Sequence, residues 1–241
     1  MTHSYSEEKI YELESKIRSF PLRIIEVQES ERHRISQEIH DDLGQSLAAL
    51  KMLIQSSVGQ EYLENTKNHR AYQRVIDYID EIIDKTREIA TSLRPRVIET
   101  MGLTRAIKKL LAAFRNNKGI HIAARIGNLN RITFQGDRIN LYRILQEALA
   151  NLYHHAEATH VEVVFRQGRQ SLTMIIKDNG KGFLPDQAIK DIGHASKHGL
   201  STMHERARLL GGELRIKSAP GQGTQIHLNV PVIFTEAEGK G

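Results

Sequence analysis

One helical segment, ISQEIHDDLGQSLAALKMLI (residues 35–54), carries three polar side chains that could do chemistry beside an ordinary apolar stripe. His40 carries an imidazole, and the ring nitrogen of a neutral imidazole is a nucleophile. In an α-helix, His40 is rotated by about 100° from Ile39, toward solvent. Gln45 follows Asp41 by four residues, so the two side chains share one helix face. The plain alternative is a charged, solvated helix surface.

A second helical segment, LQEALANLYHHA (residues 145–156), spaces Glu147, Asn151 and His155 four residues apart, on one helix face. An asparagine oxygen suits Mg²⁺, which takes hard oxygen ligands and keeps several waters. His154 and His155 are too few for a zinc site, because no matching acid–histidine spacing accompanies them. The alternative is a polar, solvated helix face.

Glycine-rich turns follow in the second half of the chain. In DNGKGF, Asp178 ends a predicted strand. A carboxylate fixed there can accept a hydrogen bond from an exocyclic amine such as that of adenine. Gly180 and Gly182 allow the backbone to turn and to approach a ligand. Taken alone, the pattern is also explained by a β-turn.

Two further glycine sites lie beyond this turn. Gly199 opens the predicted helix GLSTMHERARLLGG, and helix N-termini attract phosphates. The segment PGQGT contains Gly223 and Thr224, and by itself it predicts a hairpin loop.

The composition narrows the classes of partner. Hydrophobic residues make up 39% and charged residues 26% of the 241, which is typical of a globular protein, and cysteine is absent, which excludes disulfides. No apolar run approaches the roughly 20 residues that span a bilayer, and the N-terminus is too polar for a signal peptide. We expect a cytoplasmic protein, attached to a membrane only through a sensor region outside this sequence. The formal net charge is +5, but lysine and arginine are interspersed with acids, which predicts no nucleic-acid partner.

The apolar residues of the first half recur at steps of three and four, the spacing of packed helices. The stripes cover residues 10–27, 35–54 and 75–93. Pro21 predicts a kink or a helix restart in the first stripe, and Pro95 ends the third. The second and third stripes predict an antiparallel helical hairpin. Since each helix has a single apolar stripe, we expect a homodimer in which two hairpins form a four-helix bundle.

The second half predicts strands that pair as hairpins. Residues 159–165 and 171–178 form the first predicted hairpin, and residues 213–219 and 224–232 form the second. Residues 119–127 predict an edge strand.

Two predicted helices, residues 139–156 and 199–212, would cover this sheet and give an α+β fold. We expect a linker with a helical piece of its own over residues 98–128.

The order of these motifs is more specific than any one of them: an asparagine-bearing helix, a D-x-G-x-G turn, a glycine-led helix and a G-x-G-T turn. It resembles the ATP-binding domain of the histidine kinase, gyrase, Hsp90 and MutL (GHKL) superfamily. ERHRISQEIHDDLGQSL (residues 31–47) resembles the phosphoacceptor box of sensor histidine kinases of the NarX and DesK type. LRPRVIETMGLTRAI (residues 93–107) resembles the connection between their two domains. The resemblance covers residues 28–233.

The resemblance implies the cytoplasmic portion of a two-component sensor histidine kinase. Its fold would be a helical hairpin that forms a dimeric four-helix bundle, followed by a GHKL-type α/β-sandwich domain. The implied domains are a signalling coiled coil (1–30), a dimerisation and histidine phosphotransfer domain (31–97), a linker (98–128) and a catalytic ATP-binding domain (129–235).

In such a kinase, ATP phosphorylates His40, and the phosphoryl group passes to an aspartate on the receiver domain of a response regulator. By resemblance, Asp41 holds and deprotonates the imidazole as a general base. Gln45 is expected to orient water in the reverse, phosphatase reaction.

The resemblance also implies the residues of the nucleotide site. Asn151 is expected to hold Mg²⁺, His155 to lie near the phosphates and Asp178 to read adenine. The other residues expected at ATP are Glu147, Gly180, Gly182, Gly199, Leu200, Gly223 and Thr224. Residues 184–198 are expected to form a mobile lid.

Two positions depart from the family pattern. His154 stands where lysine is usual, so a fixed positive charge near the phosphates is lost or becomes pH-dependent. Thr202 stands where the lid helix usually has glycine. Both departures bear on the catalytic rate.

Two other functions stay open. A GHKL-type ATPase would use Glu147 to activate water, but it would not need the phosphoacceptor box. An inactive dimeric scaffold that only binds a regulator would not need intact Asn151, Asp178, Gly180 and Gly182. Acid-labile phosphorylation separates the first from a kinase, and nucleotide binding separates the second.

Overall fold

The computed structural model describes residues 2–58, 66–95, 97–118, 120–184 and 195–234. Residues 26–96 form one compact unit, and residues 97–241 belong to the other, together with residues 1–25. Among the helices described, none is long and apolar enough to cross a bilayer.

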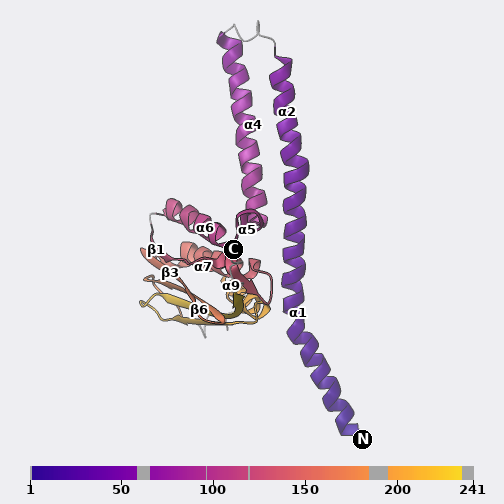
Figure 1. The fold of residues 1–241 in the computed structure, drawn as a ribbon, viewed down its shortest axis with the longest axis vertical. Helices are drawn as coiled ribbons and strands as arrows, with labels where there is room; N and C mark the ends of the chain where they lie inside the picture. The colour runs from indigo at the N-terminus through magenta and orange to yellow at the C-terminus, as the bar shows by residue number, and fades with distance from the viewer. Residues whose placement is uncertain (1, 59–65, 96, 119, 185–194, 235–241) are drawn as a thin grey trace, which may run out of the picture. The chain divides into compact units, whose positions relative to one another are not determined.

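The first unit is a helical hairpin, as the apolar stripes predict, and α2 and α4 run side by side in Figure 1. Its helical elements are the part of α1 (Thr2–Glu38) from residue 26 onward, the π-helical turn η1 (Ile39–Gly44), α2 (Gln45–Ser57) and α4 (Thr66–Leu93). The connection between α2 and α4 lies outside the described residues. Pro21 lies inside α1, which continues through it, so of the two predicted alternatives the helix restart is wrong and the kink stays a prediction.

Polar contacts tie the two arms of the hairpin together. The Ser36 hydroxyl is buried and donates to the Ala90 carbonyl at 2.9 Å. Lys51 Nζ lies 2.6 Å from a carboxylate oxygen of Asp80. Buried isoleucines of α4 fill the space between the arms, namely Ile76, Ile79 and Ile83.

The hairpin leaves a large apolar surface uncovered. Leu43 is 49% exposed, and Leu50 on α2 is 46% exposed. Other exposed apolar side chains of the hairpin are Met52, Leu53, Val75, Tyr78 and Ile89. Soluble monomers rarely expose apolar side chains in such numbers on one element pair.

The second unit contains a six-stranded sheet in the order β1-β3-β4-β6-β2, and β5 also pairs with β6. Among the strands that the structure describes, the β1–β3 pair is parallel and the other pairs are antiparallel. The strands are β1 (His121–Arg125), β2 (Ile132–Phe134), β3 (His160–Gln167), β4 (Ser171–Asp178), β5 (Glu213–Ser218) and β6 (Thr224–Phe234). Both predicted hairpins and the predicted edge strand are confirmed, whereas β2 was not predicted.

Helices cover one face of this sheet, as Figure 1 shows, and the two layers confirm the predicted α+β fold. The helical elements are α5 (Val97–Met101), α6 (Leu103–Lys118), η2 (Leu129–Arg131), α7 (Ile139–Asn151), the π-helical turn η3 (Leu152–Ala156) and α9 (Ala195–Leu209). The alternating strand residues and one face of each helix meet in a single apolar core.

Residues 98–128, for which we expected a linker, lie inside the second unit. Leu103 and Ile107 of α6 are fully buried in its core, and Ile122 of β1 is buried with them. The physical reason is the helical spacing of the apolar residues in α6, which gives that helix a face that must be covered.

Substituting Ile107 tests this placement. Because Ile107 is 0% exposed, we expect Ile107→Ala to lower the free energy of unfolding by about 2–5 kcal/mol. Lys108→Ala, at the exposed next position, is the control and should change it by less than about 0.5 kcal/mol. Urea unfolding measures both. Equal effects would mean that α6 is a linker and not core.

Candidate functional site

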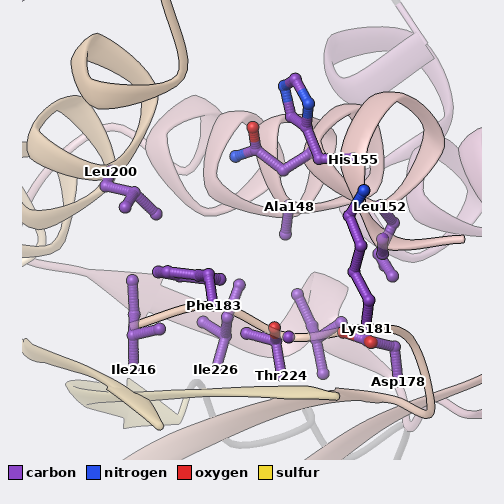
Figure 2. A pocket seen from close by; sticks show the side chains of 14 residues that line it. Ala148, Leu152, His155, Asp178, Lys181, Phe183, Leu200, Ile216, Thr224 and Ile226 are labelled. Atoms are coloured by element: carbon purple, nitrogen blue, oxygen red, sulfur yellow. The ribbon is translucent and has the colours of Figure 1, made fainter. Parts of the chain in front are cut away.

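A cavity of about 180 Å³ opens between the sheet and α7 with its extension η3. Figure 2 shows Ala148, Leu152 and His155 on the helical side, and Ile216, Ile226, Thr224 and Asp178 on the side of the sheet. The complete lining is Ala148, Asn151, Leu152, His155, Ala156, Ile176, Asp178, Lys181, Gly182, Phe183, Leu200, Ile216, Thr224 and Ile226. An apolar cavity with a few convergent polar groups is typical of a site for a small organic ligand.

Asp178 is the buried carboxylate of this cavity, and only 6% of the residue is exposed. It stands at the last position of β4. One oxygen accepts the Gly180 N–H at 2.8 Å, and the carboxylate also accepts the Thr224 N–H. Burial raises the pKa of Asp178, and the two backbone donors oppose that rise. A carboxylate held in this way presents its remaining acceptor capacity to the cavity.

The glycines around Asp178 are required by close backbone approach. A Cβ on Gly180 would lie 2.2 Å from the Ala156 carbonyl oxygen. A Cβ on Gly223 would lie 2.1 Å from the carbonyl oxygen of Asp178 itself, and Gly223 has a φ of +71°. Gly180 therefore lets its turn pack on η3, and Gly223 lets the hairpin turn pack on Asp178. Gly182 and Thr224 line the cavity directly.

Ser218 joins these two turns and was missed in the sequence. Its hydroxyl accepts the Phe183 N–H at 2.9 Å and donates to the Gly223 carbonyl at 3.0 Å. A lone serine near the end of a strand has no motif that would have marked it. The contact comes from the pairing of β5 with β6, which puts Ser218 opposite Thr224.

The polar residues of α7 divide into two groups. Asn151 and His155 line the cavity, but Glu147 is not among its lining residues. The Asn151 amide nitrogen donates to Glu147 at 3.4 Å, so the amide oxygen is the atom that could bind a cation. Glu147 and Asn151 are in contact, and Asn151 and His155 line the same cavity, so neighbouring members of the predicted row share a face, although Glu147 does not reach the cavity.

Gly199 does not open a helix, contrary to the prediction. The helix α9 already begins at Ala195, so Gly199 lies within it. A Cβ at Gly199 would meet a carboxylate oxygen of Glu147 at 2.0 Å, so this glycine lets α9 pack on α7. Leu200 does line the cavity. Of the predicted lid, residues 185–194 lie outside the described residues.

Several lining residues were not predicted, among them Lys181 and Phe183 of the DNGKGF turn. Lys181 Nζ donates to the Glu157 carboxylate at 2.8 Å. Ile216 and Ile226 pair directly across β5 and β6 and form part of the apolar wall. The alternation of apolar residues along these strands was a usable signal for the wall.

His40 lies in the other unit, in the π-helical turn η1. Its side chain is exposed while Ile39 is half-buried, so the predicted orientation toward solvent is confirmed. Asp41 and Gln45 are exposed as well. Gln45 follows Asp41 across a π-helical turn, which has more residues per turn than an α-helix, and that the two side chains share a face stays a prediction.

Alanine substitutions at two glycines with similar positive φ angles distinguish the cost of backbone strain from the cost of a steric clash. Gly221 has a φ of +77° and nothing within 4 Å of an added Cβ, whereas Gly223 has φ +71° and the Asp178 oxygen at 2.1 Å. We expect Gly221→Ala to lower the free energy of unfolding by about 1 kcal/mol. Gly223→Ala should cost about 1–3 kcal/mol more because it overpacks. Urea unfolding measures both, and equal losses would contradict the packing argument.

The raised pKa of Asp178 predicts a pH-dependent stability. The folded state binds this proton more tightly than the unfolded chain, whose ordinary value is 3.8. The free energy of unfolding therefore falls as the pH rises from 3.8 through the raised pKa, and this loss remains at neutral pH. Asp178→Asn should be at least as stable as the wild type at pH 7, with an advantage that disappears below pH 3.8.

Asp178→Ala is the matched control for that measurement. It removes the charge but also the acceptor for the Gly180 and Thr224 N–H groups, so we expect it to be less stable than Asp178→Asn. Thermal or urea unfolding between pH 3 and pH 8 would record both. If Asp178→Asn is less stable than the wild type at pH 7, ionisation of Asp178 does not lower the free energy of unfolding, and the prediction is wrong.

The chain matches two protein families. Residues 31–98 match HisKA_3, described as histidine kinase. Residues 136–233 match HATPase_c, described as histidine kinase-, DNA gyrase B- and HSP90-like ATPase. The cavity and Asp178 lie in the second segment, and His40 lies in the first.

Individual relatives agree with these families. The chain is 34% identical over 222 residues to the signal transduction histidine-protein kinase/phosphatase DegS of Brevibacillus brevis, covering 90% of this chain and 55% of DegS. It is 33% identical over 210 residues to the sensor histidine kinase LiaS of Bacillus subtilis (strain 168), covering 87% of this chain and 56% of LiaS. This chain thus spans about half the length of either relative.

Among solved structures, the mycobacterial sensor histidine kinase MprB matches 55% of this chain and 95% of its own, with 22% identity and a TM-score of 0.43. The two consecutive family matches and the relatives found in sequence are the stronger findings. On these, the chain belongs to the sensor histidine kinases that combine a HisKA_3 segment with a HATPase_c domain.

Proposed function

We propose that this chain is the kinase portion of a two-component sensor, which uses ATP to phosphorylate His40 and passes the phosphoryl group to an aspartate of a response regulator. The observation that carries the proposal is the buried Asp178 carboxylate in an apolar cavity, within a segment that matches HATPase_c. The exposed His40, in the segment that matches HisKA_3, supplies the acceptor.

The cavity fits an adenine ring. Ile176, Ile226 and Phe183 provide apolar walls, and Asp178 provides an acceptor for the exocyclic amine of adenine. A buried acceptor without a partner costs free energy, so a purine that lacks this amine should bind poorly. Gly182 and Thr224 let the base approach the sheet edge.

The residues beside the base fit the rest of Mg²⁺-ATP. The Asn151 oxygen is a hard ligand of the kind Mg²⁺ takes, because the amide nitrogen is turned toward Glu147. Asn151 would hold a Mg²⁺ ion there, and the charge of that ion would offset the negative charge on the phosphates. His155 lines the same cavity and would donate a hydrogen bond toward the phosphates. Lys181 lines it as well, with its Nζ paired with Glu157.

At the acceptor, an imidazole nitrogen of His40 attacks the γ-phosphorus of ATP, the bond to the bridging oxygen breaks, and ADP leaves. Asp41 is the next residue and is exposed like His40. Its carboxylate accepts the proton of the imidazole and so keeps the attacking nitrogen nucleophilic. Gln45 begins α2 directly after η1 and would orient water for hydrolysis of the regulator's phosphoaspartate.

The acceptor helices require a partner copy. Leu43 and Leu50 are exposed in the single hairpin, as are Tyr78 and Ile89 of α4. Two hairpins packed as a four-helix bundle would bury these side chains. We therefore propose a homodimer through α2 and α4.

An ATPase that uses Glu147 to activate water is the alternative with an acid at the required spacing. Glu147 packs against Gly199 of α9 and accepts from Asn151, and it does not line the cavity. These contacts favour a supporting role for Glu147 over water activation.

Incubation with Mg²⁺ and ATP labelled on the γ-phosphate tests the kinase directly. We expect label on the wild type that is stable in base and lost in acid. His40→Ala should carry none, because it lacks the acceptor nitrogen, while Gln45→Ala should be labelled like the wild type. Steady ATP hydrolysis without label would favour the ATPase. Label retained on His40→Ala would place the acceptor elsewhere.

A charge on the exposed apolar face tests the dimer. Leu50→Asp puts a carboxylate where we propose a buried contact, so the chain should shift from dimer to monomer, measured by light scattering after size exclusion. Ile233→Asp is the control, since Ile233 is 72% exposed on β6 of the other unit. A dimeric Leu50→Asp variant would contradict the proposed interface.

A further inference from the structure

Two histidines lie side by side on the sheet, outside the site described above. His121 of β1 and His160 of β3 are directly paired in the parallel register. Their neighbours Ile122 and Val161 are buried, so both imidazoles project from the exposed face. The ring centroids are 5.4 Å apart, with a tilt of 55° between the planes.

This separation matches two ligands of one metal ion. An imidazole nitrogen binds Zn²⁺ at about 2.0–2.1 Å, which puts each ring centroid about 3.2 Å from the ion, and a tetrahedral angle then separates the centroids by about 5.2 Å. The observed 5.4 Å therefore needs little movement of either ring.

A hydrogen-bond network orients the His160 ring. Its Nδ1 lies 2.9 Å from the Thr159 hydroxyl oxygen, which accepts the Asn179 amide N–H at 2.9 Å. A hydroxyl oxygen has two lone pairs, so it can also accept a proton from Nδ1. The opposite nitrogen, Nε2, is then the unprotonated one. Metal-binding histidines typically donate their second N–H to an oxygen in this way.

We propose that His121 and His160 form a binding site for a first-row transition-metal cation such as Zn²⁺ or Ni²⁺. The ion would be held by two imidazole nitrogens, with waters completing its coordination. The nearby Glu162 carboxylate is engaged by Arg125, and no group of three metal-binding side chains exists among the described residues. The site is therefore exchangeable and weaker than a closed structural zinc site.

The position of the site links it to the cavity. Asn179 follows Asp178 directly, and its side-chain oxygen accepts the N–H groups of Thr159 and His160 at 3.0 and 2.9 Å. The same side chain therefore orients His160 and fixes the turn that follows β4. An ion bound here stabilises that turn, because it binds the folded arrangement and not the unfolded chain.

Titration of the untagged full chain with ZnCl₂ and, separately, NiCl₂ tests the site, by calorimetry and by thermal unfolding. We expect one saturable ion per chain and a rise in Tm. His121→Ala and His160→Ala should each weaken binding at least about tenfold, since one imidazole of two is lost, and Thr159→Val should weaken it less but measurably. Circular dichroism checks that each variant is folded. If one is not, His121→Gln, which also removes an imidazole from the pair, is measured in its place.

His227→Ala is the matched control, because His227 belongs to β6 of the same sheet and is not adjacent to the pair. It should bind like the wild type. Binding that survives His121→Ala and His160→Ala unchanged would locate the ion elsewhere, for example at His154 and His155, and would overturn the proposal. No binding by the wild type at millimolar metal would overturn it as well.

Discussion

Asp178 is a carboxylate buried at the end of a strand, and the unit around it is arranged to tolerate that burial. Two backbone N–H groups, from Gly180 and Thr224, offset part of the cost of removing the charge from water. The Gly180 donor lies two residues further along the same turn. The Thr224 donor comes from the neighbouring turn, which can approach Asp178 because glycine stands at position 223. The proposed function gives the remaining acceptor capacity of Asp178 to the bound nucleotide.

The helical unit is organised by a different constraint, the change of periodicity at η1. Ser36, Ile39, Gly44 and Leu47 are less exposed than their immediate neighbours before and after the turn, with a step of five across the π-helical residues. That step keeps both flanking helices in register with α4 while His40 stays exposed. Extra residues in one helical turn are frequent at functional sites.

Much of this architecture is readable in the sequence, because each element carries its own periodicity. The stripes of the hairpin and the alternation of β3, β4, β5 and β6 are local signals. β2 was missed since its three residues are too few to alternate. The helical face of α6 was also visible, but the sequence could not say that it packs into the core of the second unit.

The parts of the site that could not be predicted depend on contacts between distant residues. Ser218 bonds to the two turns only after β5 pairs with β6. Glycine is needed at position 199 because Glu147 of α7 packs against it, and not because a helix starts there. The π-helical turns after Glu38 and Asn151 replace α-helical spacing without a residue pattern that marks them.

The claim on which the account depends is that Asp178 reads the amine of adenine, and a pair of nucleotides tests it most directly. Inosine diphosphate differs from ADP at the purine by a carbonyl oxygen in place of that amine. Calorimetric titration of the wild-type chain with each should show IDP binding at least about tenfold more weakly, because a buried acceptor then faces another acceptor. Equal affinity for ADP and IDP would contradict the account.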